Sequence, residues 1–491
     1  MKLTRACRVV CSLIICLCAH TSSAQTRPTG AELARVPQVR RALDYIKSIE
    51  LETIEEQIRI TEIPAPTFKE QKRAEYFKRR FAQLGLKNVR IDRAGNCLGE
   101  RPGAGGNLAP TLVVAAHLDT VFDEQTDTKV KRDGTILKAP GIADDGRGLT
   151  LLVALVRALD EAKIQTSGNV VFVANVGEEG LGDLKGTRHL FNDELKDRIT
   201  HFISIDGAGL SITNQAVGSF RYRVTYTGPG GHSYGAFGLP NPIHALGRLI
   251  EKVSRFQTPA EPKTTFNVGR IEGGTSVNSI ARAASLEMDM RSVSANELAK
   301  LDGEFKKAAQ TALEEENSRW ASERKLTVEV KVIGNRPTGA QAADAPIVQA
   351  ALAADRALGI KSELDASSTD SNVPISIGIP AITIDGGGSS RGTHSLDESF
   401  DLTDSHIGSQ RALLTVLGIV GVRNDSINRR WCYEHREKDA ARRRISDAEP
   451  APRWPCGARH RREPGLGVRD GSGARARRGQ CRAGGADKGR A

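Results

Sequence analysis

Cysteine is scarce in the patterned part of this 491-residue chain. Four of its eight cysteines fall within the first 24 residues, and three more lie beyond residue 430. Only Cys97 lies among the alternating apolar and polar segments that predict a fold. This distribution excludes a disulfide framework and a cysteine-rich zinc site. A metal ion in this protein would therefore be held by histidine and carboxylate side chains.

Long apolar runs are also missing. The run at 9–19, VVCSLIICLCA, is too short to span a bilayer. It follows three basic residues and precedes the small residues Ser22, Ser23 and Ala24. That order is typical of a secretory signal peptide, which we place at 1–24. We therefore expect a secreted or periplasmic protein with no membrane span in the mature chain.

Aromatic residues are few, and the net charge of +11 is unevenly distributed. The segment 425–491 has 18 Lys and Arg against 9 Asp and Glu, whereas residues 25–424 are close to neutral. This basic tail is rich in Arg, Gly and Ala and has no hydrophobic periodicity, so we expect disorder. Its few aromatic residues form no stacking platform, and no nucleic-acid partner is expected. The abrupt change in composition equally fits a shifted reading frame at the end of the gene.

The chain is too long for one ordinary core, so two domains are expected. Apolar runs alternate with amphipathic segments, the pattern of an α/β fold with a central, mostly parallel sheet flanked by helices. Strands are predicted at 111–117, 170–180, 201–206 and 380–386. Helices are predicted within 32–60, 141–160 and 405–422, among others.

The pattern changes between residues 219 and 334. There the order of strands and helices becomes β-α-β-β-α-β, which predicts an inserted two-layer α+β domain of ferredoxin-like topology. The α/β domain would then be discontinuous, with a first part at 25–218 and a second part at 335–424.

The predicted parallel strands all lead to ionisable side chains. These are His117 and Asp119, Glu178 and Glu179, Asp206, and His394. In open α/β sheets, ligands collect at the carboxyl ends of the strands, so one shared site is expected. Adjacent carboxylates at the end of a buried strand repel each other unless a cation or a shared proton compensates them.

Two of the polar motifs are ambiguous when taken alone. In His117-Leu118-Asp119, the strand period of two points both side chains to one side, so Asp119 can accept a hydrogen bond from the imidazole and orient it. Asp144 and Asp145 begin a predicted helix, where carboxylates also serve as caps.

Taken in order, the motifs HLDTV, GIADDGRG, GEEG, IDG, GPGGHS and GTHSLDES resemble a known family. It is the zinc metallopeptidase family of peptidase T, glutamate carboxypeptidase, aminoacylase and acetylornithine deacetylase, and the chain looks most similar to peptidase T. The resemblance covers about 35–424. It implies that two metal ions are held by His117, Asp144, Glu179, Asp206 and His394, with Asp144 bridging, and that Glu178 is the general base.

The chemistry agrees with that ligand set. Two divalent ions about 3.5 to 4 Å apart can hold a bridging water, lower its pKa and polarise the scissile carbonyl. Imidazole and carboxylate ligands suit zinc, and ligand type also allows cobalt or manganese. A coordinated glutamate is a poor base because the metal stabilises its anion. One glutamate of the pair would therefore bind metal while its neighbour moves the proton.

The resemblance also implies that the α/β domain is the catalytic domain and that the inserted domain is a lid or dimerisation domain, and it assigns residues of the latter. It implies that His232 stabilises the oxyanion, often in the partner subunit's site, so a homodimer through this domain is expected. Asn278 and Arg291 match positions that hold the substrate's carboxylate or carbonyl. A surface ion pair is the alternative for Arg291. The chain departs from many relatives after the paired aspartates, where Gly146 and Arg147 replace lysine.

The sequence thus predicts a dinuclear exopeptidase that hydrolyses short peptides. The alternative is an amidohydrolase of the same architecture that acts on N-acyl amino acids. Asp206, where some relatives have Glu, favours an aminopeptidase, but aminopeptidase, carboxypeptidase and deacylase activities all stay open. A non-catalytic binding protein on this scaffold would lack a ligand or the base, and here none is missing.

Overall fold

The computed structural model describes residues 30–106, 109–361 and 363–423. The predicted signal peptide and the predicted basic tail both lie outside these residues. Of the helices that are described, none combines the length and the apolar character needed to cross a membrane.

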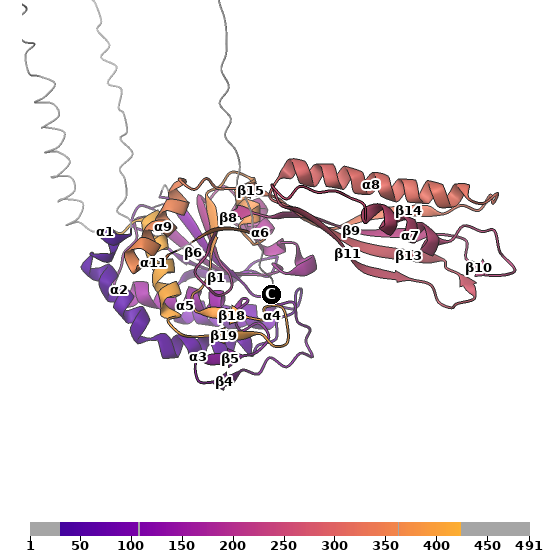
Figure 1. Cartoon of the computed structure of the whole chain (residues 1–491). Helices are drawn as coiled ribbons and strands as arrows, with labels where there is room; N and C mark the ends of the chain where they lie inside the picture. Colours follow the sequence, from indigo (N-terminus) through magenta and orange to yellow (C-terminus); the bar gives the residue numbers. More distant parts are fainter. Residues whose placement is uncertain (1–29, 107–108, 362, 424–491) are drawn as a thin grey trace, which may run out of the picture. The chain divides into compact units, whose positions relative to one another are not determined.

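A mixed sheet forms the centre of the α/β part (Figure 1). Over the described residues it has nine strands. They are β1 (Lys87–Ile91), β2 (Cys97–Arg101), β3 (Thr111–His117), β6 (Asn169–Asn175), β7 (His201–Ile205), β8 (Ile212–Ala216), β15 (Gly339–Ala340), β16 (Leu364–Ser367) and β17 (Ala381–Ile384). The central order is β6-β3-β7-β17, and these four strands are parallel. Their carboxyl ends therefore share one edge, as the sequence predicts.

Helices cover both faces of this sheet, which explains why β3 is apolar and buried along its whole length. Alternate strand residues, such as Val113 and Ala115, pack with apolar side chains of the segment 184–199. The helices of this part are α1 (Ala31–Ala34), α2 (Pro37–Ser48), α3 (Glu50–Thr61), α4 (Gln71–Gln83), α5 (Gly146–Glu161), α6 (Lys185–His189), η2 (Gly180–Gly182), η3 (Leu190–Glu194), α9 (Pro346–Leu358), α10 (Asn372–Ser376) and α11 (His406–Val420).

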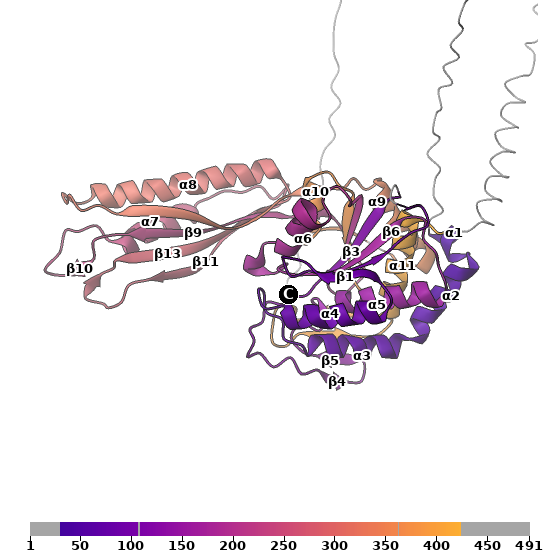
Figure 2. The same cartoon turned by 180° about the vertical axis from the view of Figure 1, so that it is seen from behind.

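The inserted segment has its own sheet and core, as predicted. Its elements are β9 (Gly218–Thr227), β10 (Gly231–His232), α7 (Pro242–Val253), β11 (Thr264–Gly273), β12 (Ser279–Ile280), β13 (Ala283–Ser292), α8 (Ala295–Ser318) and β14 (Thr327–Arg336). The main sheet is antiparallel in the order β11-β13-β9-β14. Figure 2 shows α7 and α8 lying along it, and their apolar faces, including Leu249 and Phe305, complete a separate core. The predicted fold class is confirmed, while the exact domain boundaries stay a prediction.

A small four-stranded sheet in the α/β part was not predicted. It joins β4 (Lys131–Asp133), β5 (Ile136–Lys138), β18 (Ser389–Arg391) and β19 (Ser399–Asp401) in the order β18-β19-β5-β4. Each strand has only three residues, too few to show a period of two. The sheet matters because it brings the segment before Asp144 against the loop that carries His394.

Candidate metal centre and active site

The predicted metal ligands converge at the carboxyl edge of the parallel strands. His117 Nε2 lies 2.9 Å from Asp144 Oδ1 and 3.7 Å from Asp206 Oδ1. His394 Nε2 lies 3.0 Å from Asp144 Oδ2 and 2.8 Å from Glu179 Oε1. The five side chains thus sort into two groups of three that share Asp144, one group on each of its carboxylate oxygens.

This arrangement fits a pair of metal ions. Asp144 Oδ1 is buried and has no hydrogen-bond partner, although His117 Nε2 is only 2.9 Å away. Two ligand atoms that are close but not in hydrogen-bond geometry are expected when both point toward the position of one metal ion. His117, Asp144 and Glu179 each bring one ligand atom within 4.8 Å of the others. Imidazole and carboxylate donors without thiolate match the ligands of catalytic zinc sites.

Asp144 and Asp145 have separate roles. The carboxylate of Asp145 accepts from the backbone N–H of Gly148, so Asp145 is the N-cap of α5. Its other contacts are with the backbone N–H groups of His117 and Gly207, which end β3 and follow β7. Asp144 is not used as a cap and faces the ligand cluster. The helix-cap interpretation therefore holds for the second aspartate alone.

The turn that carries Asp144 is held by Glu398, a residue that sequence reasoning missed. The buried carboxylate of Glu398 accepts hydrogen bonds from the backbone N–H groups of Gly141, Ala143 and Asp144 at 2.9 to 3.1 Å. Burial raises the pKa of Glu398 against the lowering effect of these hydrogen bonds. Glu398 lies in the same GTHSLDES motif as His394, so one loop both supplies a ligand and positions another.

Asp119 differs from its prediction. His117 Nδ1 lies 3.0 Å from the backbone carbonyl of Asp119, whereas the carboxylate is 3.6 Å away. The carbonyl is therefore the nearer acceptor for the imidazole. The carboxylate instead accepts from the backbone N–H groups of Glu178 and Glu179 at 3.0 and 2.9 Å, and from the hydroxyl of Thr67. Its main contact is thus with the loop that bears the two glutamates.

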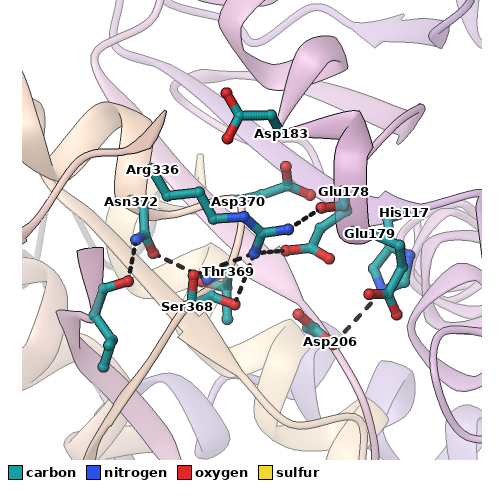
Figure 3. Close-up of polar contacts among 12 residues, drawn as sticks. His117, Glu178, Glu179, Asp183, Asp206, Arg336, Ser368, Thr369, Asp370 and Asn372 are labelled. Carbon is teal, nitrogen blue, oxygen red and sulfur yellow. Dashed lines mark hydrogen bonds and ion pairs between the residues drawn. The ribbon is translucent and has the colours of Figure 1, made fainter. Parts of the chain in front are cut away.

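Glu178 stands apart from the ligand cluster and is paired with Arg336. Arg336 Nη1 donates to Glu178 Oε1 at 2.8 Å, and Arg336 Nη2 donates to the carbonyl of the same residue (Figure 3). Both side chains are about 95% buried. Arg336 also donates to the hydroxyl of Ser368. It ends β14, just beyond the predicted limit of the inserted domain, and no motif marks it.

The electrostatics of the site follow from burial. Burial raises the pKa of Glu178 well above its ordinary value, while the cation of Arg336 opposes that shift. The contacts with Asp144 and Glu179 raise the pKa of His394 to about 10. His394 has φ of 66°, in the left-handed region that non-glycine residues rarely adopt. Such backbone strain is common at functional sites.

These residues open into a cavity of about 850 Å³, which is also lined by side chains of the inserted domain. Among them is Arg291, whose Nε donates to Asp289 Oδ2 at 2.7 Å. Asp289 Oδ1 accepts from Arg221 Nε, and Arg221 Nη1 donates to the carbonyl of Gly180. The surface ion pair considered for Arg291 thus exists, but it lies in the wall of the cavity.

His232 and Asn278 are not among the residues that line this cavity. They lie together near β10 and β12, where Ser233 N donates to the carbonyl of Asn278. His232 is exposed, and its Nδ1 accepts from the backbone N–H groups of Tyr234 and Gly235. Within one chain, neither residue joins the metal ligands.

Arg147 does not take the place of a site lysine. It is fully buried, and it donates to the carbonyls of Gly386 and Ser405 at 2.8 and 2.6 Å. Its guanidinium also lies over the ring of Phe400. The departure from the resemblance therefore affects packing between the helix and the loops, and the ligand cluster is intact.

Comparison with known proteins agrees with this geometry. The family described as Peptidase family M20/M25/M40 matches residues 113–417, well over half of the chain. The chain belongs to this family. The uncharacterized protein YqjE of Bacillus subtilis is 26% identical over 347 residues, covering 67% of this chain and 89% of YqjE.

Solved structures show the same fold. Aminopeptidase PepT from Bacillus cereus has a TM-score of 0.60 at 20% identity, over 75% of this chain and 98% of PepT. A dinuclear metal-binding M20 peptidase from Bacillus subtilis has a TM-score of 0.56 at 17% identity, over 76% and 99% of the two chains. The predicted family is confirmed, and with it a hydrolase of metal-dependent peptidase type that acts on peptide bonds.

Proposed function

We propose that this M20 peptidase is a dinuclear exopeptidase for short peptides that uses Glu178 as its general base. The observation that carries the proposal is that the two adjacent glutamates contact different partners. Glu179 faces His394 and Asp144, whereas Glu178 is held outside the cluster by Arg336. A base must reach the reacting water and be free of metal ligation. Glu178 supports this role because it lines the same cavity as the ligands but belongs to neither ligand group.

The two ions would occupy the two groups that share Asp144. His117 and Asp206 complete one group, and Glu179 and His394 complete the other. Zinc suits these ligands, with cobalt or manganese as alternatives. When bound, the ions would activate water as a nucleophile and polarise the scissile carbonyl.

The chain's own residues then move the proton and hold the substrate. Glu178 accepts a proton from the attacking water and delivers it to the leaving amine. Burial favours its protonated form, so its basicity is higher than that of a solvated glutamate. Arg291, oriented by Asp289, presents a planar fork to a carboxylate of the peptide within the cavity.

The substitution Glu178→Gln tests this assignment. We expect it to retain metal and to lower turnover by about 10² to 10⁴-fold, the usual cost of removing a general base. Metal content and steady-state rate are measured on the same preparation. Glu124→Gln, at an exposed ion pair with Lys69, serves as the control. Loss of metal together with activity would reverse the roles of Glu178 and Glu179.

Substrate screening separates the exopeptidase from the N-acyl-amino-acid hydrolase. The zinc-loaded protein is assayed with di- and tripeptides, with their N-acetylated and C-amidated forms, and with N-acyl amino acids. An aminopeptidase requires the free amine, and a carboxypeptidase requires the free carboxylate. Turnover confined to N-acyl amino acids would replace the exopeptidase proposal with the alternative.

We further propose a homodimer through the inserted domain, in which His232 serves the neighbouring chain. Tyr234 and Phe237, which follow His232 in the sequence, are exposed, and so is Val277, which precedes β12, the strand that pairs with His232. The sheet also has unpaired edges at β11 and β14 among the described strands. Sheet edges favour pairing with another chain, and a two-fold dimer would place each His232 in an equivalent position.

Complementation between inactive variants tests this dimer. Glu178→Gln and His232→Ala are mixed after reversible dissociation, and heterodimers are verified by differential tags. If His232 acts across the interface, heterodimers regain one working site of the two. A mixture that contains heterodimers but recovers no activity would show that His232 does not act in trans.

Export is proposed from the signal-like residues 1–24. Expression of the full chain followed by cell fractionation and N-terminal sequencing tests this. Cleavage after Ala24 with recovery outside the cytoplasm is the expected outcome. An uncleaved cytoplasmic protein would refute it.

A further inference from the structure

A second group of potential ligands lies away from the cavity. It comprises Asp92, which follows β1, His189 at the end of α6, and Glu194 at the end of η3. Each offers one ligand atom, and these atoms all lie within 4.8 Å of one another. None of the three lines the active-site cavity. The family's ligand motifs do not include them, and the proposed reaction does not use them.

His189 is oriented as a metal-binding histidine would be. Its Nδ1 lies 3.2 Å from Asp193 Oδ2, a distance that suits an N–H donated to the carboxylate. With the proton on Nδ1, the lone pair of Nε2 is available. Nε2 is buried and has no hydrogen-bond partner within the described part of the chain. It lies 3.9 Å from Asp92 Oδ2, too far for a hydrogen bond. Carboxylate–imidazole pairs of this kind orient metal ligands.

Asp92 is held rigidly in place. Its Oδ1 accepts from the backbone N–H groups of Ala94, Gly95 and Asn96, and its Oδ2 accepts from the Asn96 side chain. Its side chain is fully buried. Asn96 in turn donates to the carbonyl of Gly186 in α6. The turn at 92–96 therefore presents a fixed carboxylate to the imidazole.

Glu194 adds a second carboxylate, and the acidic groups of this cluster outnumber the cations paired with them. Arg90 Nε donates to Glu194 Oε1 at 2.7 Å, so one oxygen of Glu194 is engaged by a fixed positive group. Arg90 and Arg198 also pair with Glu100. The acidic groups here are Asp92, Asp193, Glu194 and Glu100, and the cations paired with them are Arg90 and Arg198. Acidic groups thus outnumber these cations by two, the charge of one divalent ion.

We infer that Asp92, His189 and Glu194 form a separate binding site for a divalent metal ion, with zinc as the best match to one imidazole and two carboxylates. Zinc–ligand bonds of 2.0 to 2.2 Å place tetrahedral ligand atoms about 3.3 to 3.6 Å apart. The Nε2 to Oδ2 distance of 3.9 Å therefore needs to shorten by roughly half an ångström on binding. Water would complete the coordination.

Such an ion would join segments that are distant in sequence. It would link the hairpin turn after β1 to η3, which follows α6. The 178–184 loop that carries the paired glutamates leads directly into α6. A metal at this position would stabilise the folded state by mass action, since the unfolded chain does not hold the three ligands together.

Equilibrium dialysis of the untagged full chain against buffered zinc chloride tests the site. The readout is the difference in bound zinc between wild type and His189→Ala at each free zinc concentration. We expect His189→Ala to bind one zinc less per chain and to keep its peptidase activity. His244→Ala, which removes an exposed histidine of the inserted domain, should bind as much zinc as wild type. Because the test is a difference, it does not depend on how many ions the active site holds.

Two further variants complete the experiment. Asp193→Asn should retain the site but weaken it by about 10 to 100-fold, the usual effect of losing the group that orients a ligand. Glu194→Gln should lower zinc binding like His189→Ala and replaces it if that variant does not fold. Equal zinc binding by wild type, His189→Ala and Glu194→Gln at every concentration would refute the site. A zinc-dependent rise in melting temperature that is smaller in His189→Ala than in wild type would support it.

Discussion

The substitution Arg336→Met gives the sharpest test of how the proposed base is held. It preserves much of the side-chain volume and removes the donors to Glu178 Oε1, to the Glu178 carbonyl and to Ser368. The carboxylate of Glu178 would then be buried without a cation. Removing one partner of a buried ion pair typically costs about 3 to 5 kcal/mol. We expect a loss of about 3 kcal/mol in the free energy of unfolding, since Glu178 can escape part of the penalty by taking up a proton.

The loss of stability caused by Arg336→Met should depend on pH. The direction of this dependence follows from the direction of the pKa shift of Glu178. Burial already raises the pKa of Glu178 above its unfolded value, and Arg336 opposes this. A carboxyl with a raised folded pKa loses stability as pH rises from its unfolded pKa through its folded pKa. Without Arg336 the folded pKa rises further, so the loss continues to higher pH. The stability gap between variant and wild type should be larger at pH 8 than at pH 5.

Urea unfolding of both proteins at matched free zinc measures the gap. A double-mutant cycle with Glu178→Gln isolates the pair, because the neutral amide does not need the cation. Arg223→Gln, at an exposed ion pair on β9, is the control and should show no such pH dependence. The acidic limb of the pH profile of kcat/KM should also move to higher pH in Arg336→Met. Additive effects of Arg336→Met and Glu178→Gln, within about 0.5 kcal/mol, would refute the coupling.

Three other outcomes are expected. Glu398→Gln places an amide against the backbone N–H donors of the Asp144 turn, so metal affinity should fall by about 10 to 100-fold. Activity should return when the variant is saturated with zinc. An unchanged metal affinity would contradict this prediction. Chelation should abolish activity. It should also lower the melting temperature, because Asp144 Oδ1 would remain buried and unpartnered. Full activity after verified metal removal would exclude a metal-dependent mechanism. Burial raises the pKa of Asp385 to about 6, so wild-type stability should fall between about pH 4 and 6. Asp385→Asn should therefore be more stable than wild type at pH 8, by at most about 3 kcal/mol, and not at pH 4; an equal effect at both pH values would rule out titration of Asp385.

Local signals in the sequence were strong enough to predict the architecture. The apolar runs that became β3, β6, β7 and β17 are short and bounded by turn residues, so they could be identified one at a time. Because parallel strands end at one edge, the residues after them could be expected to meet. His117, Glu179, Asp206 and the Asp144 turn do meet there. The ordered motifs made the family identifiable before any geometry was considered.

Contacts between distant segments could not be predicted in this way. Arg336 and Glu178 are 158 positions apart, and Glu398 lies 254 positions from Asp144. None of these partners has a periodic signal, since a single ion pair or cap depends on where two backbones come together. The same holds for the three-residue strands β5 and β19, which pair with each other although they lie far apart in the chain.

The sequence by itself determined which chemical groups are available and which strand ends deliver them, because hydrophobic period and residue type are local properties. Only the tertiary structure decided what each group does. It made Asp145 a helix cap and left Asp144 facing the ligands, it turned the Asp119 carboxylate toward the glutamate loop, and it placed a buried arginine on Glu178. It also brought His189 to Asp92. These roles depend on burial and on distances between side chains, and both are set by packing.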